Sequence, residues 1–307
     1  CLLSRGLGDV YKRQEHLFVE NTHSYILFFT DKGKCYWVKV YDIPEGGRAA
    51  KGRAIVNLIG CEPDEKVSAF IGVKQDQFHD DHFVVMATEK GIVKKTKLSA
   101  YSNPRKKGIY AVEIREGDSL IEARVSNGEN DILLGTTNGK SIRFSEEQIR
   151  PSGRKTMGVK GITLSSSDDK VVGMLLIKRE GTVLVATENG FGKRTEIIQY
   201  RAQKRGGKGV LTMKTTDKIG KMITIKEVVG TDDLMIIRDD GVLIRMPVSQ
   251  IRSIGRATQG VKLIKLAEGT RVSAITRIIS EEEKTVDEPK DSPCLLYTSP
   301  SPRDKRQ

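Results

Sequence analysis

Basic residues recur beside glycine at one position of a repeated pattern in this chain. Four copies of the pattern carry an arginine four residues before a glycine, and a fifth carries it three residues before. The arginines are Arg48, Arg105, Arg154, Arg205 and Arg256, and the glycines that follow them are Gly52, Gly108, Gly158, Gly209 and Gly260. Lysines stand among them, at Lys51, Lys106, Lys107, Lys155, Lys204 and Lys208. Because Arg and Lys neutralise phosphate charge and glycine lets a backbone approach closely, this pattern predicts contacts with a phosphate backbone.

A second basic position lies four residues after another recurring glycine. It is filled by Lys95, Arg143, Arg194 and Arg245, whereas Trp37 interrupts the series. Lys94 and Lys193 add a further cation in two copies. A single glycine-arginine pair is most simply a solvated turn, but equivalent positions of a repeat occupy equivalent places on the folded body. Five copies in phase therefore predict a continuous basic belt.

The elements that must position these residues are short strands. Each copy begins with an apolar run that ends in a polar turn closed by Gly33, Gly91, Gly139, Gly190 or Gly241. Asn-Gly and Asp-Gly between apolar runs are strong hairpin signals, because these residues accept a positive φ. The turn glycines are 58, 48, 51 and 51 residues apart, and a period near 50 is typical of stacked or radial units. We predict an all-β, propeller-like repeat of four-stranded blades with few helices. The third strand of each repeat should follow the glycine that comes after the arginine, namely Gly52, Gly108, Gly158, Gly209 or Gly260. An open solenoid is the competing architecture.

The predicted domain covers residues 15–280, with repeats at about 15–79, 80–128, 129–179, 180–230 and 231–280. An acidic tail, residues 281–293, follows it. Residues 1–14 and 294–307 have the same length and the same ends, since each begins with Cys-Leu-Leu and ends with Lys-Arg-Gln. Two unrelated natural termini would not share these ends, so we interpret both as artefactual flanks of translated adapter sequence.

The charge of the chain indicates a polyanionic partner. The formal net charge is +12 and the pI is about 9.4. The positive charges of the two flanks and the negative charge of the acidic tail cancel, so the core carries the same net charge as the whole chain. Nucleic acid and an anionic membrane surface would both fit, but the chain has no apolar run long enough to span a bilayer and no basic amphipathic helix. We therefore expect no membrane partner.

Other candidate sites are weaker. Outside the flanks only Cys35 and Cys61 remain, and we interpret them as reduced core thiols of a cytoplasmic protein. The segment His79-Asp80-Asp81-His82 could suggest a metal site, but a solvated loop is the simpler interpretation because further ligands at recognisable spacing are missing. The sequence predicts no catalytic residue and no metal.

One segment, Gln203-Lys204-Arg205-Gly206-Gly207-Lys208-Gly209, resembles the seven-residue box Q-R-R-G-G-K-G of DNA gyrase A subunits. Residues 55–58, 86–88, 93–96, 190–195 and 255–261 also resemble this family, so the resemblance covers essentially the whole core. It implies the C-terminal β-pinwheel domain of these subunits. In the family the defining box lies in the first of six blades, whereas 203–209 falls in the fourth repeat here. The resemblance therefore implies about five blades of six, a chain that begins just after the defining box, and a general DNA contact for residues 203–209.

The resemblance also implies a mechanism. Double-stranded DNA would bend around the rim and be presented to the gyrase B subunit, and to the rest of the gyrase A subunit, within an A2B2 holoenzyme. That holoenzyme would be an ATP-hydrolysing type IIA topoisomerase that introduces negative supercoils. The DNA-cleaving tyrosine, ATP and Mg would act elsewhere in it, so this chain would need no cofactor and would not be catalytic alone.

The expected location of the chain is the bacterial cytoplasm, at the nucleoid. Two alternatives remain open at this point. One is the corresponding C-terminal domain of topoisomerase IV, and the other is a non-enzymatic protein-interaction propeller.

Overall fold

The computed structural model describes residues 20–44, 55–62, 64–78, 81–105, 107–178, 181–267 and 269–278, and the backbone of 4–5 and 13–14. The short strands β1 (Ser4–Arg5) and β2 (Arg13–Gln14) pair antiparallel. The rest of the predicted first flank, the acidic tail and the second flank lie outside the described residues.

Each repeat begins with a β-hairpin closed by one of the predicted turn glycines, all five of which have a positive φ. The hairpins are β3 (Tyr25–Thr30) with β4 (Lys34–Lys39), β6 (Phe83–Thr88) with β7 (Ile92–Lys97), β10 (Asp131–Thr136) with β11 (Lys140–Ser145), β14 (Thr182–Thr187) with β15 (Phe191–Glu196), and β18 (Asp233–Arg238) with β19 (Leu243–Pro247). A longer strand then pairs with the first strand of each hairpin: β5 (Val67–Val73), β9 (Leu120–Ser126), β13 (Val171–Ile177), β17 (Met222–Val228) and β21 (Val272–Ile278). The predicted all-β repeat is confirmed.

The fourth strand of a blade comes from the next repeat, which the sequence did not predict. These strands have two residues each: β8 (Ile109–Tyr110), β12 (Val159–Lys160), β16 (Val210–Leu211) and β20 (Val261–Lys262). They pair with β4, β7, β11 and β15 respectively. Blades 1 to 4 therefore have four strands, in the order β5-β3-β4-β8 and its equivalents, and blade 5 has three, β19-β18-β21. Each of blades 1 to 4 is joined to the next repeat by this exchange.

Helical segments are short. In the first repeat, where a strand was expected after Gly52, the structure has the helix α1 (Ile55–Ile59) instead. A single 3-10 turn ends the second hairpin strand of each repeat: η1 (Val40–Asp42), η3 (Leu98–Tyr101), η4 (Glu146–Gln148), η5 (Ile197–Gln199) and η6 (Val248–Gln250). A further turn, η2 (Gln75–Gln77), follows β5.

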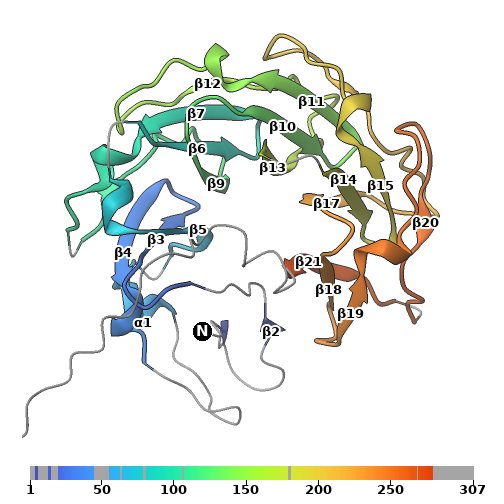
Figure 1. Cartoon of the computed structure of the whole chain (residues 1–307), viewed down its shortest axis with the longest axis horizontal. Coiled ribbons are helices and arrows are strands. Elements are labelled where there is room, and N and C mark those ends of the chain that lie inside the picture. The colour runs from blue at the N-terminus through green and yellow to red at the C-terminus, as the bar shows by residue number, and fades with distance from the viewer. Residues whose placement is uncertain are drawn as a thin grey trace, which may run out of the picture.

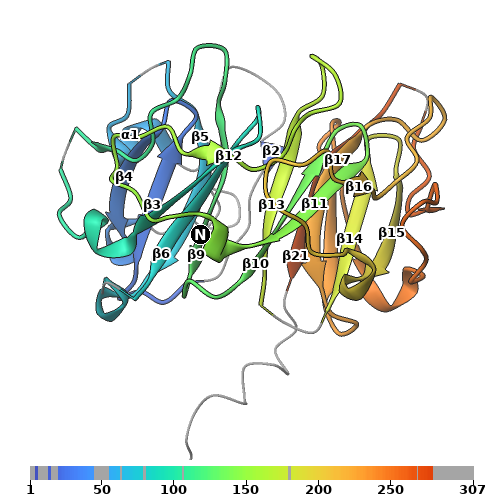
Figure 2. The ribbon, with the colours of Figure 1, turned by 90° about the horizontal axis from the view of Figure 1, so that it is seen from above.

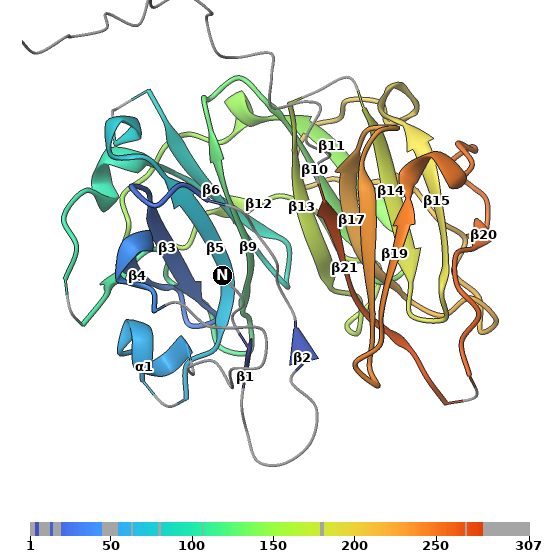
Figure 3. The ribbon, with the colours of Figure 1, turned by 60° about the horizontal axis from the view of Figure 1, so that its bottom comes forward.

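The blades succeed one another along an arc in sequence order (Figure 1). The strands β5, β9, β13, β17 and β21 line the inside of the arc, and the exchanged strands, such as β12 and β20, lie at its perimeter (Figure 1). Views from two further directions show the same succession of blades (Figure 2, Figure 3).

The hydrophobic core lies between neighbouring blades. Leu27 and Phe29 of blade 1, for example, belong to one buried cluster with Val84 and Met86 of blade 2. Both faces of a middle strand are thus covered, which explains why the first hairpin strand is a continuous apolar run and not an alternating one. Full burial of such a side chain contributes about 1.5–3 kcal/mol, so neighbouring blades depend on each other for stability.

Candidate nucleic-acid interface

The predicted basic segments form loops that cross from one repeat to the blade before it. We call residues 153–158, 203–209 and 255–260 the rim loops, since they lead into the outermost strands β12, β16 and β20. In the second repeat, residues 107–108 lead into β8. Arg48, Lys51 and Lys106 lie outside the described residues.

Two glycines hold each rim loop in place, as the joint between β11 and β16 shows. A Cβ on Gly139 (φ +75°) would lie 2.1 Å from the carbonyl oxygen of Met213, and a Cβ on Gly209 (φ +70°) would lie 2.4 Å from that of Ser141. Thr212 N–H donates to the Gly139 carbonyl at 2.8 Å. The close packing of the exchanged strand on the preceding blade therefore requires the recurring glycines. At glycines such as Gly209 the sequence predicted only the approach of a ligand and not this reason.

The rim loops are linked in series along the outer edge. Each accepts a backbone hydrogen bond from the residues that follow the exchanged strand of the previous repeat. The bonds are Glu113 N to Thr156 O (3.1 Å), Thr163 N to Gly207 O (2.9 Å) and Lys214 N to Thr258 O (3.1 Å). Because the same step relates successive loops, Arg154, Arg205 and Arg256 occupy equivalent places along one edge of the arc.

Most rim-loop cations face solvent. Lys155, Lys204, Arg205 and Lys208 are exposed, as are Arg105 and Lys107 of the second repeat, and Arg154 and Arg256 are partly exposed. The structure thus leaves these side chains accessible to a ligand along the rim.

The loop 203–209 is held on the third repeat by a second set of contacts. The Arg205 guanidinium donates to the carbonyls of Gln148 (3.0 Å) and Lys160 (3.2 Å). The Gln148 amide bonds the backbone of Gln203 and Arg205, and the Thr163 hydroxyl donates to the Gly206 carbonyl at 2.7 Å. Arg205 therefore both fixes its own loop and presents part of its charge to solvent.

The second predicted basic position has a different role in the structure. Arg143 of blade 3 forms an ion pair with Asp131 (2.7 Å) and donates to the carbonyls of Ile197 and Tyr200 in the next repeat, each at 3.2 Å. Arg194 of blade 4 likewise donates to the Ile251 carbonyl at 2.7 Å. These two side chains therefore each connect their blade to the next repeat by hydrogen bonds.

Lys95 and Arg245 complete this series. Lys95 is buried and forms an ion pair of 2.9 Å with Glu146, which belongs to the next repeat and is also buried. Arg245, in the last blade, forms an ion pair with Asp233 of its own hairpin and is 64% exposed. Of the four, Arg245 retains the open position that the sequence predicted for all of them.

Lys94 and Lys193 are buried, with 1% and 0% of their surface exposed. Burial lowers the pKa of each ammonium group to about 8. The Lys193 ammonium bonds backbone carbonyls of the next repeat, and the Lys94 ammonium bonds one carbonyl of its own repeat (Ala111) and one of the next (Arg154). The sequence predicted Lys94, Lys95 and Lys193 as direct phosphate ligands. We correct this prediction for all three, because a side chain enclosed by protein cannot reach a phosphate in this conformation.

Two exposed lysines at the rim were not predicted. Lys160 and Lys262 end the outermost strands β12 and β20 and are exposed. Each stands two residues after the glycine that ends its rim loop, Gly158 or Gly260. Tyr110 and Leu211 fill this position in the second and fourth repeats. These lysines extend the cationic edge beyond the loops themselves.

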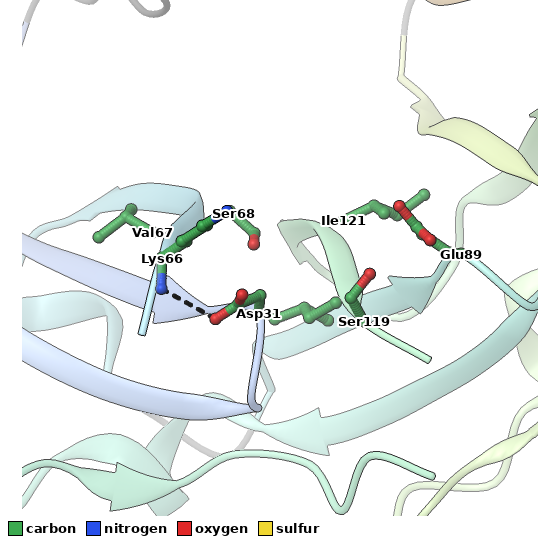
Figure 4. Close-up of a pocket in the computed structure, with 8 residues that line it drawn as sticks. Asp31, Lys66, Val67, Ser68, Glu89, Ser119 and Ile121 are labelled. Carbon is green, nitrogen blue, oxygen red and sulfur yellow. Dashed lines mark hydrogen bonds between the residues drawn. The ribbon is translucent and has the colours of Figure 1, made fainter. Parts of the chain in front are cut away.

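A pocket between the first two blades lies at the beginning of the inner strands (Figure 4). Its lining includes the carboxylates of Asp31 and Glu89, and Asp31 accepts a hydrogen bond of 2.9 Å from the backbone of Lys66. Carboxylates repel phosphate, so this pocket does not extend the basic edge. In the described part of the chain, no three His, Cys, Asp or Glu side chains gather as a metal site requires. No helix among the described residues has the length and apolar character needed to cross a membrane.

Comparisons with known proteins agree with this geometry. The family model described as "DNA gyrase C-terminal domain, beta-propeller" matches residues 24–72, 82–127, 130–178, 181–228 and 232–278. The DNA gyrase A subunit of Staphylococcus aureus (strain NCTC 8325 / PS 47) is 43% identical over 274 residues, which cover 89% of this chain and 31% of that protein. The chain thus spans about a third of the length of the curated relatives it matches.

Two solved structures share the fold. The C-terminal domain of DNA topoisomerase IV superposes with a TM-score of 0.76 at 24% identity, covering 84% of this chain and 80% of that one. The C-terminal domain of DNA gyrase A superposes with a TM-score of 0.75 at 21% identity, covering 90% of each chain. The fold therefore does not separate gyrase from topoisomerase IV, whereas the 43% identity to gyrase A subunits favours gyrase. The family match, which covers five repeats, and this identity show that the chain belongs to the DNA gyrase A C-terminal domain family.

Proposed function

We propose that this chain binds duplex DNA along its outer edge and bends it around the arc. The observation that carries the proposal is the series of rim loops, each bonded to the repeat before it and each bearing an arginine at an equivalent place. Contacts of this kind go to phosphates and sugars and read little sequence. We therefore expect binding that is nearly indifferent to sequence and steeply dependent on salt.

The magnitudes are compatible with bending. Bending a site of 20–30 base pairs by 40–90° costs on the order of 1–6 kcal/mol. A protein that makes about 6–10 phosphate contacts loses roughly 10³–10⁵ in affinity between 50 and 200 mM salt, which shows how much free energy such contacts contribute. The exposed and partly exposed rim cations of repeats 2 to 5, supplemented by Lys160 and Lys262, are numerous enough to offset the cost of bending.

We further propose that the bent DNA serves a type IIA topoisomerase holoenzyme. In this proposal the chain forms part of a gyrase A subunit, which assembles with the gyrase B subunit into an A2B2 complex. The chain supplies a positively wrapped DNA segment that ATP-driven strand passage converts into negative supercoils. DNA cleavage, ATP and Mg belong to other parts of that assembly, in the bacterial cytoplasm at the nucleoid. The support for this step is the 43% identity to gyrase A subunits.

The topology of a ligated circle tests the wrap. Singly nicked plasmid is incubated with increasing amounts of the chain, sealed with DNA ligase and freed of protein. We expect the linking number to shift in the positive direction in proportion to bound chain. Binding without any shift in linking number would contradict bending around the arc.

A further inference from the structure

We infer that Lys94 and Lys193 are positioning residues, each of which clamps an arginine-bearing rim loop of the next repeat in the place where it meets DNA. This inference rests on the proposed function and deepens it. The two lysines stand at equivalent positions of β7 and β15, three residues after the turn glycine. Neither is free to bind phosphate itself, because both are buried.

The two clamps share one contact, the bond from the lysine to the backbone carbonyl of a rim-loop arginine. Lys193 Nζ donates to the carbonyls of Gly255 (2.7 Å) and Arg256 and to the Thr258 hydroxyl (3.1 Å), all within one rim loop. Lys94 Nζ donates to the carbonyls of Ala111 (2.8 Å) and Arg154, and the latter lies in the rim loop of the third repeat. In each case the ammonium group bonds the backbone of the belt arginine. The lysine therefore sets where that arginine stands.

The charges around the clamp favour an anion docked on the rim loop. The Lys193 ammonium is fully buried, and its three acceptors are neutral oxygens. Burial, and then repulsion from the nearby Arg256, lower the pKa of Lys193. Burial also lowers the pKa of Lys94; Glu113 partly compensates there, and Arg154 adds repulsion. A buried cation beside a second cation is costly, and a phosphate docked on the arginine would relieve that cost.

Blade 3 supplies a matched control within the chain. The position equivalent to Lys94 and Lys193 is filled there by Ile142, which is buried. A Cβ on Gly207 would lie 3.4 Å from the Ile142 Cδ1, so this isoleucine packs against the loop 203–209. That loop is held instead by Gln148 and by Arg205 itself. Lysine-to-isoleucine substitutions therefore introduce a residue that the fold already accepts at this position.

The experiment compares Lys193→Ile, Arg256→Ala and the double variant of the whole chain by hydrogen exchange and by binding to linear duplex DNA. We expect the amides of 255–260 to exchange faster in Lys193→Ile, while those of 203–209 are unchanged. At 0.1 M salt we expect each single variant to lose about eightfold in affinity, the value for one phosphate contact. The double variant should lose little more, because the two changes remove the same contact. Unchanged exchange in 255–260, or losses that multiply, would overturn the clamp.

A second pair of variants keeps the test independent of folding at one site. Lys94→Ile and Arg154→Ala repeat the comparison with the loop 153–158, should Lys193→Ile fail to fold. Failure of the DNA proposal gives a different pattern: Arg256→Ala and Arg154→Ala would then leave affinity unchanged, while hydrogen exchange would still decide whether the lysines hold the loops.

Discussion

Removing rim-loop lysines should change the salt dependence of DNA binding by an amount that the number of contacts fixes. The triple variant Lys155→Ala, Lys204→Ala, Lys208→Ala removes three exposed cations from the rim loops. Each phosphate contact contributes about 0.9 to the slope of log affinity against log salt, so the slope should become less negative by roughly 2.7. Between 50 and 200 mM salt, the variant should therefore lose about 40-fold less affinity than the unchanged chain does.

A matched control separates the rim loops from the net charge. Lys66, Lys170 and Lys221 each stand directly before an inner strand and are exposed, so replacing all three by alanine removes the same charge elsewhere. Fluorescence anisotropy with a 30-base-pair duplex at several salt concentrations measures both slopes. We expect the control variant to keep a slope close to that of the unchanged chain. Equal changes of slope in the two triple variants would refute the assignment of the contacts to the rim loops.

Three further predictions concern the framework that holds the loops. Glu146→Gln should lower the free energy of unfolding by about 3–5 kcal/mol in urea titrations, because it leaves the buried Lys95 ammonium without its anionic partner. Gly209→Ala should cost at least about 1–2 kcal/mol from its left-handed backbone alone and lower the melting temperature. Burial lowers the pKa of Lys94 and Lys193 to about 8 in the folded chain, below the ordinary value near 10.4. Between about pH 8 and pH 10.4 the unfolded chain therefore binds more protons than the folded chain, and the free energy of unfolding rises with pH. Chemical denaturation should therefore show a larger gain in stability from pH 7 to pH 9 for the unchanged chain than for the variant with both lysines replaced by isoleucine.

The repeat and its hairpins could be predicted because their signals are local. A turn that needs a positive φ selects glycine wherever it occurs, so Gly33 and its four equivalents mark the hairpins without any knowledge of tertiary structure. The apolar runs before these turns mark the middle strand of each blade for the same reason. Both features of the all-β fold are therefore visible in the sequence.

The exchange of strands could not be predicted from the same signals. Val210 and Leu211 alternate in the same way whether they pair with their own hairpin or with β11 of the preceding blade. The repeat period gives the spacing of such strands and not their partner. The second glycine, such as Gly209, marks the joint, but its meaning becomes clear only from the strand it packs against.

The direction of the cationic side chains was the other feature that the sequence could not give. Lys94 and Lys95 are neighbours in β7 and point to opposite faces of the blade, yet both are buried because another blade or loop covers each face. In a half-exposed sheet, one of the two would face solvent. Equivalence of position within the repeat was thus predictable, whereas exposure depends on how the blades pack.

Lysine footprinting tests most directly whether DNA lies along the rim loops. The chain, free and bound to duplex DNA, is treated with an acetylating reagent, and the reaction of each lysine is measured by mass spectrometry. We predict that DNA protects Lys155, Lys204 and Lys208 and leaves Lys66 and Lys221 reactive. Protection of Lys66 and Lys221 with full reactivity at the rim loops would contradict the account.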